Sequence, residues 1–412
     1  MEPGLGKTLT ALQAWRRGGS RSLVVVAPVS ALGVWHSELS DLGYDIPYLP
    51  ATGAAKVRVI RWSIPYALSR IIVINYEALL NKEVLLALHE LGDFTLILDE
   101  SQRIKTPSAK RSRAATALSK DRQTFILSGT PVTRNLLDLY GQFKAIDPTI
   151  FDTMSFSKFK QRYAVMGGYG NYQVVGYRDI PDLEARIAPY TYALRKEDAL
   201  DLPPQVDQVV PVTAHPAQWR QYRELANGGL WLGEPVDNPL VRALRLQQLA
   251  GLFKIDHTLD QVQTLLEAGE KVVVFYKFLE EGRQLMSRLP KGTLHLHGMV
   301  SASRRGEMVD IFQNTPLSGV FLAQIDAGAV AITLTASSNV VYHSMSWSYE
   351  SATQSRDRVH RVGQTRHTTY RYMTFTGPDG QTSIDTLIAN ALTNKETIAS
   401  MVMDNPELLR TD

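Results

Sequence analysis

The sequence predicts an α/β protein built on two parallel sheets. Short apolar runs alternate with stretches of helical spacing over residues 21–145, and the same alternation returns over residues 269–376. Strands that alternate with helices pair in parallel, because each helix carries the chain back across the sheet. Residues 146–205 interrupt this rhythm and predict a helical and hairpin protrusion between the two α/β regions.

The individual elements follow from the positions of these runs. In the first region we expect strands at 23–27, 71–75, 95–99 and 124–128. In the second region we expect strands at 272–275, 293–297, 319–323, 339–343 and 369–374. Residues 206–212 alternate like a further strand, and helical spacing marks residues 241–252 and 384–403.

The length of 412 residues suggests two to three domains at about 150 residues each. We expect a first lobe at 1–145, the protrusion at 146–205, a linker that opens the second lobe at 206–268, and the second lobe with a C-terminal helix at 269–412. Residues 163–177 are rich in Gly and Tyr and predict a hairpin or mobile loop. Their tyrosines either stack on nucleic-acid bases or pack the hairpin faces together.

The composition excludes several classes of protein. Hydrophobic residues make up 44% of the chain, as in ordinary folded proteins, and no run of apolar residues is long enough to span a membrane. Cysteine is absent, which excludes disulfides, thiolate metal sites and a cysteine nucleophile and fits a reducing cytosol. The net charge of +3 is too small to identify a nucleic-acid partner. Evidence for nucleic-acid binding must therefore come from local basic patches.

A phosphate-binding loop is predicted at Gly4-Leu5-Gly6-Lys7-Thr8. Glycines let backbone N–H groups approach phosphate oxygens closely, and the following helix offers its positive N-terminal end. In this pattern Lys7 reaches the β- and γ-phosphates of a nucleotide, and Thr8 ligates Mg²⁺. A plain glycine-rich turn is the alternative until a partner motif is found.

The partner motif is the apolar strand that ends in Asp99-Glu100. Open parallel sheets bind ligands at the carboxyl ends of their strands, where these two carboxylates would lie. Asp99 is therefore a candidate Mg²⁺ ligand, and Glu100 a candidate base for an attacking water. The next strand runs into Ser128-Gly129-Thr130-Pro131, whose hydroxyl groups could relay between nucleotide and nucleic acid.

Arginines mark the other end of the chain. If residues 354–366 are helical, Arg358 and Arg361 lie on one face, since residues three apart are neighbours on a helix. A permanent planar cation suits the charge on a phosphoryl group in transfer, so both are candidate catalytic residues. A solvated basic helix face is the alternative.

Taken in order, these motifs resemble those of the Swi/Snf-type ATPases of helicase superfamily two. Gly4 to Thr8 resembles motif I, Leu98-Asp99-Glu100 motif II, Leu127 to Pro131 motif III, and Gln354 to Gln364 motif VI. The resemblance implies two RecA-like lobes that clasp ATP with Mg²⁺ and bind double-stranded DNA. It assigns Gln354 to the nucleotide and assigns coupling between the two sites to Gln102, Ser128 and Thr130. Candidate DNA contacts are Ser30, Asn75, Tyr76, Arg103, Lys105, Thr335 and Trp347.

The sequence also departs from that family. The strand that should precede the phosphate loop is missing, so we expect either an earlier native start or a sheet without that strand. Gln102 stands where the family has His, and its amide can still hydrogen-bond both ways. In motif V only Gly328 remains, and Ala329, Ala331 and Thr333 replace the other expected residues, which leaves the loop geometry in question.

Two further groups allow two interpretations each. A basic cluster, Arg103, Lys105, Lys110, Arg111 and Arg113, either contacts DNA phosphates or forms a solvated face. His295 and His297 share a strand face, but without a third ligand we expect ordinary polar histidines rather than a metal pair.

The leading hypothesis is an ATP-driven translocase on double-stranded DNA, acting as a monomer through backbone contacts, with a protein partner for targeting left open. A helicase that separates or reanneals strands is a second hypothesis. A DNA-binding scaffold that hydrolyses ATP weakly is a third, motivated by the missing strand and the altered motif V. The motif variations resemble those of a bacterial or phage protein.

Overall fold

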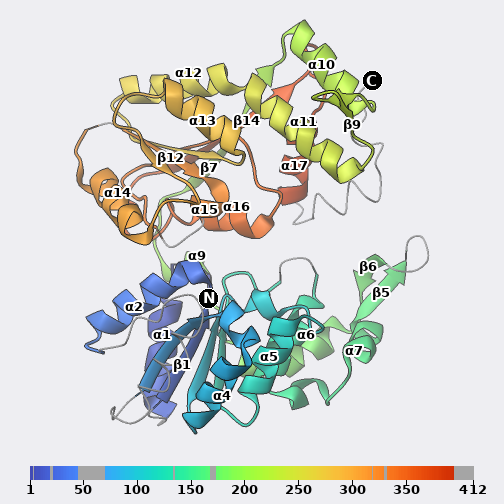
Figure 1. The fold of residues 1–412 in the computed structure, drawn as a ribbon, viewed down its shortest axis with the longest axis vertical. Coiled ribbons are helices and arrows are strands. Elements are labelled where there is room, and N and C mark those ends of the chain that lie inside the picture. Colours follow the sequence, from blue (N-terminus) through green and yellow to red (C-terminus); the bar gives the residue numbers. More distant parts are fainter. Residues whose placement is uncertain are drawn as a thin grey trace. The chain divides into compact units, whose positions relative to one another are not determined.

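The computed structural model describes residues 1–2, 4–18, 22–44, 70–132, 135–167, 173–317, 319–328 and 332–393. The chain divides into two compact units, Met1–Ala199 and Leu200–Asp412 (Figure 1). Both units are α/β with an all-parallel main sheet, which confirms the predicted fold class. Every helix in the described part of the chain is too short or too polar to traverse a lipid bilayer.

Unit 1 is organised on a four-stranded parallel sheet of order β2-β1-β3-β4. Its strands run Ser22–Ala27 (β1), Arg70–Asn75 (β2), Thr95–Asp99 (β3) and Thr124–Leu127 (β4). All four predicted strands of this region therefore form, with ends shifted by one residue at most. Among the described residues no strand precedes helix α1, and β4 lies at one edge of the sheet.

Helices cover both faces of this sheet because alternate strand residues point to opposite sides. Val24 and Val26 of β1 pack into one apolar cluster with α4 and α5, whereas Leu23 and Val25 pack into another with α1 and α2. The helices run Lys7–Gly18 (α1), Leu32–Asp41 (α2), Lys82–Glu90 (α4), Lys110–Ser119 (α5) and Asp138–Ile146 (α6). Single turns follow three of the strands at Val29–Ala31 (η1), Tyr76–Leu80 (η2) and Ser101–Ile104 (η3).

The rest of unit 1 is a small helical and hairpin region. It contains η4 (Pro148–Phe151), α7 (Phe156–Tyr163), β5 (Ala164–Gly167), β6 (Gln173–Tyr177), α8 (Ile180–Ile187), η6 (Ala188–Tyr190) and α9 (Lys196–Ala199). β5 and β6 pair antiparallel and form the hairpin predicted for residues 163–177 (Figure 1). Tyr163 is buried in an aromatic cluster with Phe159, so its ring packs rather than stacks on bases. Tyr169 and Tyr172 lie outside the described residues.

Unit 2 is organised on a six-stranded parallel sheet of order β11-β12-β10-β13-β14-β7. The strands run Gln205–Thr213 (β7), Val272–Tyr276 (β10), Leu294–Leu296 (β11), Val320–Gln324 (β12), Asn339–Tyr342 (β13) and Thr368–Thr376 (β14). Every strand predicted between 206 and 376 is present. β7, from the segment predicted as a linker, pairs along its whole length with β14 and forms one edge of the sheet.

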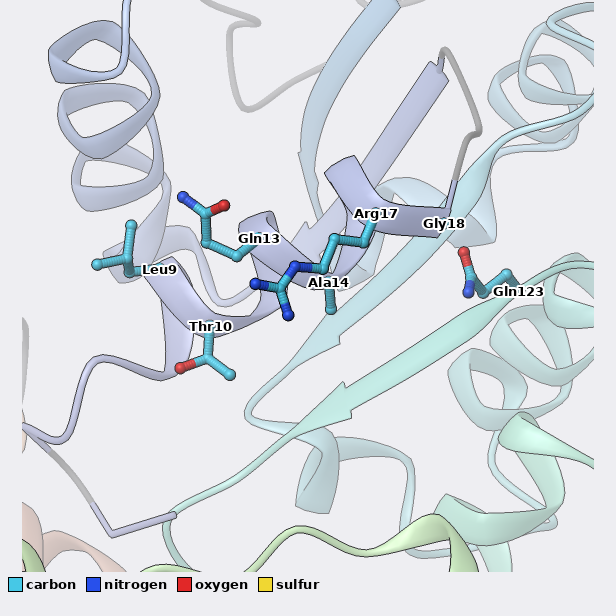
Figure 2. A pocket seen from close by; sticks show the side chains of 7 residues that line it. All are labelled: Leu9, Thr10, Gln13, Ala14, Arg17, Gly18 and Gln123. Atoms are coloured by element: carbon cyan, nitrogen blue, oxygen red, sulfur yellow. The ribbon is translucent and has the colours of Figure 1, made fainter.

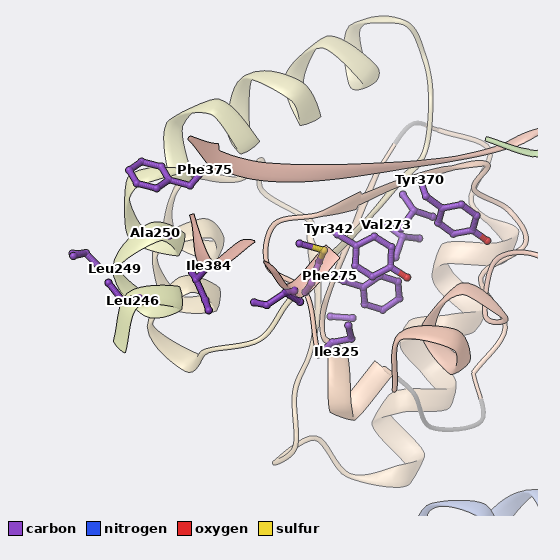
Figure 3. Packing of buried hydrophobic residues seen from close by; sticks show 14 of the residues in the cluster. Leu246, Leu249, Ala250, Val273, Phe275, Ile325, Tyr342, Tyr370, Phe375 and Ile384 are labelled. Atoms are coloured by element: carbon purple, nitrogen blue, oxygen red, sulfur yellow. The ribbon is translucent and has the colours of Figure 1, made fainter. Parts of the chain in front are cut away.

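One face of this sheet carries the largest apolar cluster. Phe275 of β10, Tyr342 of β13 and Phe375 of β14 pack there with Leu246 of α11 and Ile384 of α17 (Figure 3). The helices of the unit run Pro216–Ala226 (α10), Pro239–Phe253 (α11), Ile255–Glu267 (α12), Leu279–Arg288 (α13), Ala302–Asn314 (α14), Ile325–Gly328 (α15), Tyr349–Arg356 (α16) and Ile384–Thr393 (α17). A two-stranded hairpin joins α10 to α11, formed by Leu230–Trp231 (β8) and Glu234–Pro235 (β9).

The predicted C-terminal helix is present from residue 384 to 393, and its remainder to 403 lies outside the described residues. A fully buried ion pair ties it to α11 and the sheet. Lys254 Nζ lies 2.6 Å from Asp385 Oδ2 and also donates to the Met373 carbonyl of β14. Asp385 in turn accepts from the backbone N–H of Phe375. Buried charges need such partners, and here they come from α17, from β14 and from the residue that follows α11.

Candidate active site

The glycine-rich loop leads directly into α1. Gly4 and Gly6 have φ of 84° and 72°, a conformation that glycine adopts without strain. No atom would lie within 4 Å of a Cβ added to Gly6, so the loop leaves room beside its backbone. Lys7 and Thr8 form the first turn of α1, where backbone N–H groups have no partner within the helix. The arrangement suits an anion such as a phosphate.

Asp99 ends β3 within electrostatic reach of this loop. Its Oδ2 accepts from Trp35 Nε1 at 2.9 Å, and its Oδ1 accepts from the Glu100 N–H at 3.0 Å. Burial and the Glu100 charge raise the pKa of Asp99 to about 6, while the Trp35 bond and the Lys7 charge oppose this. Each carboxylate oxygen keeps a further lone pair, so Asp99 and Thr8 fit the oxygen ligands that Mg²⁺ takes.

Glu100 adopts a left-handed backbone, with φ of 49° and ψ of 55°. This conformation is uncommon for a residue other than glycine and is often found at functional positions. Its carboxylate Oε2 accepts from Gln102 Nε2 at 2.7 Å. The candidate base therefore lies at the turn after β3, oriented by a neighbouring side chain.

Gln102 continues this contact to the next strand. Its Oε1 accepts from Ser128 Oγ at 2.8 Å, and Ser128 Oγ accepts from the Thr130 N–H at 3.0 Å. Gln102 is almost fully buried. The three residues predicted to couple the two motifs are thus joined in one hydrogen-bonded relay from Glu100 to Thr130.

A second glutamine, which sequence reasoning missed, supports the relay from behind. Gln142 of α6 is fully buried, and its Oε1 accepts from Ser101 Oγ at 2.7 Å. Its Nε2 donates to the carbonyls of Pro131 and Asp138 at 2.7 and 2.8 Å. Gln142 therefore fixes the loops after β3 and β4 together. The sequence offered one signal for this role, since Gln142 is a polar residue among the mainly apolar residues of α6.

Two residues of unit 1 that were predicted to contact DNA form hydrogen bonds within the unit. Tyr76 is fully buried, and its hydroxyl donates to the Asp99 carbonyl at 2.7 Å. Asn75 is 3% exposed, and its Nδ2 donates to Glu77 Oε2 at 2.7 Å. Neither side chain offers accessible surface in this structure, and the contact of these two residues with DNA stays a prediction. Ser30 lies in η1, the turn after β1.

The basic cluster lies on η3 and α5. Arg103, Lys110, Arg111 and Arg113 are exposed. Lys105 is half-buried, and its Nζ lies 3.7 Å from Asp138 Oδ2. Four of the five cations thus remain available at the surface, whereas the fifth is close to an acidic partner.

A depression of about 660 Å³ lies elsewhere on unit 1, between α1 and the start of β4 (Figure 2). Its lining residues are Leu9, Thr10, Gln13, Ala14, Arg17, Gly18 and Gln123. Lys7, Thr8, Asp99 and Glu100 are not among them, so the depression is separate from the candidate nucleotide site.

In unit 2 the arginine-rich stretch is a turn rather than a helix. α16 ends at Arg356, and residues 357–363 form successive turns and bends. The expectation that Arg358 and Arg361 share a helix face is therefore wrong. Both side chains are half-buried. Gln354, inside α16, donates from Nε2 to Glu350 Oε1 at 3.4 Å.

The predicted motif V residue Thr335 lies against this turn. Gln313 Nε2 donates to Thr335 Oγ1 at 3.0 Å, and Gln364 Nε2 donates to the Thr335 carbonyl at 3.3 Å. Thr335 thus links α14 to the end of motif VI, and its hydroxyl is already engaged. Gly328 ends α15, Thr333 is half-buried, and Ala329 and Ala331 lie outside the described residues.

Trp347 shares a site with a lysine that the sequence did not single out. Lys277 follows β10, and its Nζ lies 4.4 Å from the centroid of the Trp347 ring. Gln247 Oε1 accepts from Trp347 Nε1 at 2.7 Å and from Lys277 Nζ at 3.2 Å. Burial lowers the pKa of Lys277 to about 8, although the charges of Asp326 and Glu281 oppose this. Within the described part of unit 2, no carboxylate forms a salt bridge with Lys277.

His295 of β11 and His297, just after that strand, were predicted to be ordinary polar residues, and this stays a prediction. His295 Nε2 lies 2.8 Å from Tyr276 Oη, and the rings of His295 and His297 lie 5.0 Å apart. Among the described residues there is no group of three potential metal-ligating side chains.

Two family models match this chain. The family model described as SNF2-related domain matches residues 1–274, and the model described as helicase conserved C-terminal domain matches residues 254–363. The chain belongs to the SNF2 family. The predicted resemblance is therefore confirmed, and the phosphate loop, the relay and the arginine turn of this SNF2-family chain all fall within the matched residues.

Relatives of this SNF2-family chain include larger proteins. The mouse "DNA annealing helicase and endonuclease ZRANB3" is 26% identical, and the match covers 98% of this chain and 38% of that protein. The "putative ATP-dependent helicase/translocase YwqA" of Bacillus subtilis is also 26% identical, over 98% of this chain and 46% of that protein. The chain thus spans less than half the length of these curated relatives.

A solved structure, the Sulfolobus solfataricus SWI2/SNF2 ATPase core in complex with dsDNA, is similar over 98% of this chain and 87% of that chain. The sequence identity is 22% and the TM-score is 0.40.

Proposed function

We propose that this SNF2-family chain is a DNA-dependent ATPase that moves along double-stranded DNA. The observation that carries the proposal is the relay from Glu100 through Gln102 to Ser128. It joins the candidate base, beside the phosphate loop, to the strand end that leads into the Ser128–Thr130 turn. A scaffold that only held ATP would have no need of an oriented base.

In this proposal the nucleotide is bound by the loop from Gly4 to Thr8, with Lys7 on its phosphates. Mg²⁺, held by Thr8 and Asp99, would neutralise charge on the phosphates. Glu100 accepts the proton of the attacking water, and Gln102 keeps its carboxylate in place. Arg358 and Arg361 supply permanent positive charge for the phosphoryl group in transfer, and Gln354 contacts the nucleotide.

DNA would be bound mainly through its backbone. The exposed cations Arg103, Lys110, Arg111 and Arg113 of unit 1 suit phosphate contacts, which position a duplex without reading its sequence. Lys277 of unit 2 is a further candidate, because a half-buried cation that forms no salt bridge with a described carboxylate favours an incoming anion. Such contacts make binding strongly dependent on salt.

The first test is ATP turnover with and without duplex DNA. We expect DNA to stimulate turnover, and Glu100→Gln to lower it by roughly 10²- to 10⁴-fold, the range for loss of a general base, while nucleotide binding is kept. Wild-type turnover that is near zero and equal to that of Glu100→Gln would support the scaffold instead. Displacement of a third-strand oligonucleotide from a triplex would then report movement along the duplex.

Strand annealing is a second candidate, favoured by the similarity to the mouse DNA annealing helicase and endonuclease ZRANB3. An assay with a forked duplex and with complementary single strands separates the two. Annealing or unwinding without displacement of a third strand would favour the second candidate.

A further inference from the structure

The turn that carries Arg358 and Arg361 has no helical backbone to orient it. One of its sides is attached to the segment after α15. The Leu334 N–H donates to the Arg358 carbonyl at 2.8 Å, and Gln364 Nε2 donates to the Ser337 carbonyl at 2.8 Å. These bonds attach the turn at Arg358, near its start, and at Gln364, just past its end, and Arg356, which precedes the turn, makes a different set of contacts.

Arg356, the last residue of α16, holds that beginning against the sheet edge. Its guanidinium donates to Asp207 Oδ1 and Tyr372 Oη, both at 2.5 Å, and to Gln205 Oε1 at 2.9 Å. It also lies 3.9 Å from the centroid of the Tyr370 ring. Asp207 and Gln205 belong to β7, and the two tyrosines belong to β14. One side chain therefore binds the start of the turn to both strands.

His360, inside the turn, makes a second attachment to the same part of the chain. Its Nε2 lies 2.7 Å from the Pro203 carbonyl, an acceptor, so this nitrogen carries the proton. The neighbouring Pro204 carbonyl accepts from the Thr368 N–H at 3.1 Å. Residues 203–207 are thus bonded to the arginine turn at two points and to β14 along the strand register.

The position of this segment in the chain gives these contacts their meaning. Unit 2 begins at Leu200, so residues 203–207 are among its first residues after the chain leaves unit 1. Arg356 and His360 bond directly to residues 203–207. A displacement of the backbone at 203–207 would therefore displace the arginine turn as well, without rearrangement of the apolar core.

We propose that Arg356 and His360 are positioning residues that attach the arginine turn to the first residues of unit 2, so that the two move as one body. The expected effect on ATP turnover rests on the proposed function, whereas the attachment itself does not. Hydrogen bonds to three residues together with a stacked ring need the planar guanidinium, so Lys at position 356 would restore the attachment only in part. A displacement of about 1 Å at a reacting centre can cost about 10²-fold in rate, which makes such an attachment matter for turnover.

The structural test is amide hydrogen exchange on the intact chain without nucleotide. Arg356→Gln and His360→Gln should each increase exchange in both 357–363 and 203–207, with Arg356→Lys intermediate. Arg366→Gln is the matched control, because Arg366 is a nearby exposed arginine that bonds to Glu270 and not to β7. An increase confined to one segment, or equal to that of Arg366→Gln, would overturn the attachment.

The kinetic test is DNA-stimulated ATP turnover. We expect Arg356→Gln to lower kcat by roughly 10- to 100-fold with little change in KM for ATP, since misplaced arginines would lose contacts made in the transition state. Asp207→Asn should lower kcat too, and the double variant should be less than additive because the two residues share one contact. Additive losses, or a purely KM effect, would overturn the positioning role.

These two tests separate the inference from the proposed function. A wild type with no DNA-stimulated turnover would contradict the proposed function, whereas the exchange data would still decide the attachment. Thermal unfolding of each variant shows whether unit 2 remains folded, and Arg356→Lys supplies the milder change if Arg356→Gln does not fold.

Discussion

Gln102 and Ser128 are joined by a hydrogen bond of 2.8 Å between strand ends that are separated by 26 positions in the sequence. The same glutamine donates to Glu100, so its amide uses its acceptor on one motif and its donor on the other. An amide side chain has both a donor and an acceptor, and in this orientation it joins a carboxylate to a hydroxyl that donates. Gln102 is therefore the centre of the candidate active site of unit 1.

We predict that Gln102→Ala separates ATP hydrolysis from movement. Glu100 and Ser128 each lose a hydrogen-bond partner, so the relay between the two strand ends is interrupted. The candidate residues for hydrolysis, Lys7, Asp99 and Glu100, remain in place. The number of ATP molecules consumed for each third strand displaced should rise. Gln161→Ala, at an exposed position, is the control. An unchanged ratio in Gln102→Ala would show that the relay has no part in coupling.

We predict that Trp35→Phe weakens the binding of Mg²⁺ at Asp99. The change removes the indole N–H that donates to Asp99 but keeps an aromatic ring in the core. A hydrogen bond to a charged group contributes about 1.5–3 kcal/mol, so Asp99 should become less well oriented. The Mg²⁺ concentration for half-maximal ATP turnover should increase.

Trp15→Phe is the matched control for that change. Trp15 is equally buried in the same apolar cluster, and its Nε1 has no hydrogen-bond partner among the described residues. Equal Mg²⁺ requirements in the two variants would mean that the Trp35 bond does not support Asp99.

We predict that Lys254→Met destabilises unit 2 by about 3–5 kcal/mol, because it leaves the Asp385 carboxylate buried without its cation. The double variant Lys254→Met/Asp385→Leu should recover much of this loss, since neither charge is then left unpaired. Denaturant unfolding of the single and double variants measures both values. A double variant as unstable as the sum of the two single variants would contradict the prediction.

We predict that the affinity for duplex DNA falls as the pH rises through about 8, the pKa to which burial lowers Lys277. A lysine with a lowered pKa is charged below that value and neutral above it, so its phosphate contact is lost on the alkaline side. Lys277→Gln should bind more weakly at pH 7 and lack this step. It should also reduce the slope of log affinity against log salt by about 1.

Lys291→Gln is the control for Lys277. Lys291 is exposed and precedes β11, and so lies toward the amino end of the parallel sheet, whereas Lys277 follows the carboxyl end of β10. A similar loss of affinity in both variants would indicate a general charge effect rather than a contact at Lys277.

Local sequence signals predicted the elements and several of the site residues. Glycines before a helix placed Lys7 and Thr8 in its first turn, and an apolar run placed Asp99 at a strand end. These features depend on neighbours in the sequence, which is why the sequence reveals them. The place of Gln102 between the two motifs was implied by the family resemblance instead.

Local sequence signals could not predict the contacts between residues that are far apart in the sequence. Trp35 and Asp99 are 64 positions apart, and Arg356 and Asp207 are 149 apart. Tyr76 has the polarity of a DNA contact, but the packing of η2 beneath β3 buries it. Arg358 and Arg361 show helical spacing, yet α16 ends before them because the turn bonds instead to residues 334–337 and to Pro203.

The sequence by itself determined the α/β class, the order of strands along the chain, the family and the residues that suit phosphate and metal. The tertiary structure alone decided which side chains hold those residues in place. The physical reason is that strand and helix formation follow from local periodicity. Hydrogen bonds between side chains require a separation near 3 Å, which only the packing of remote elements produces.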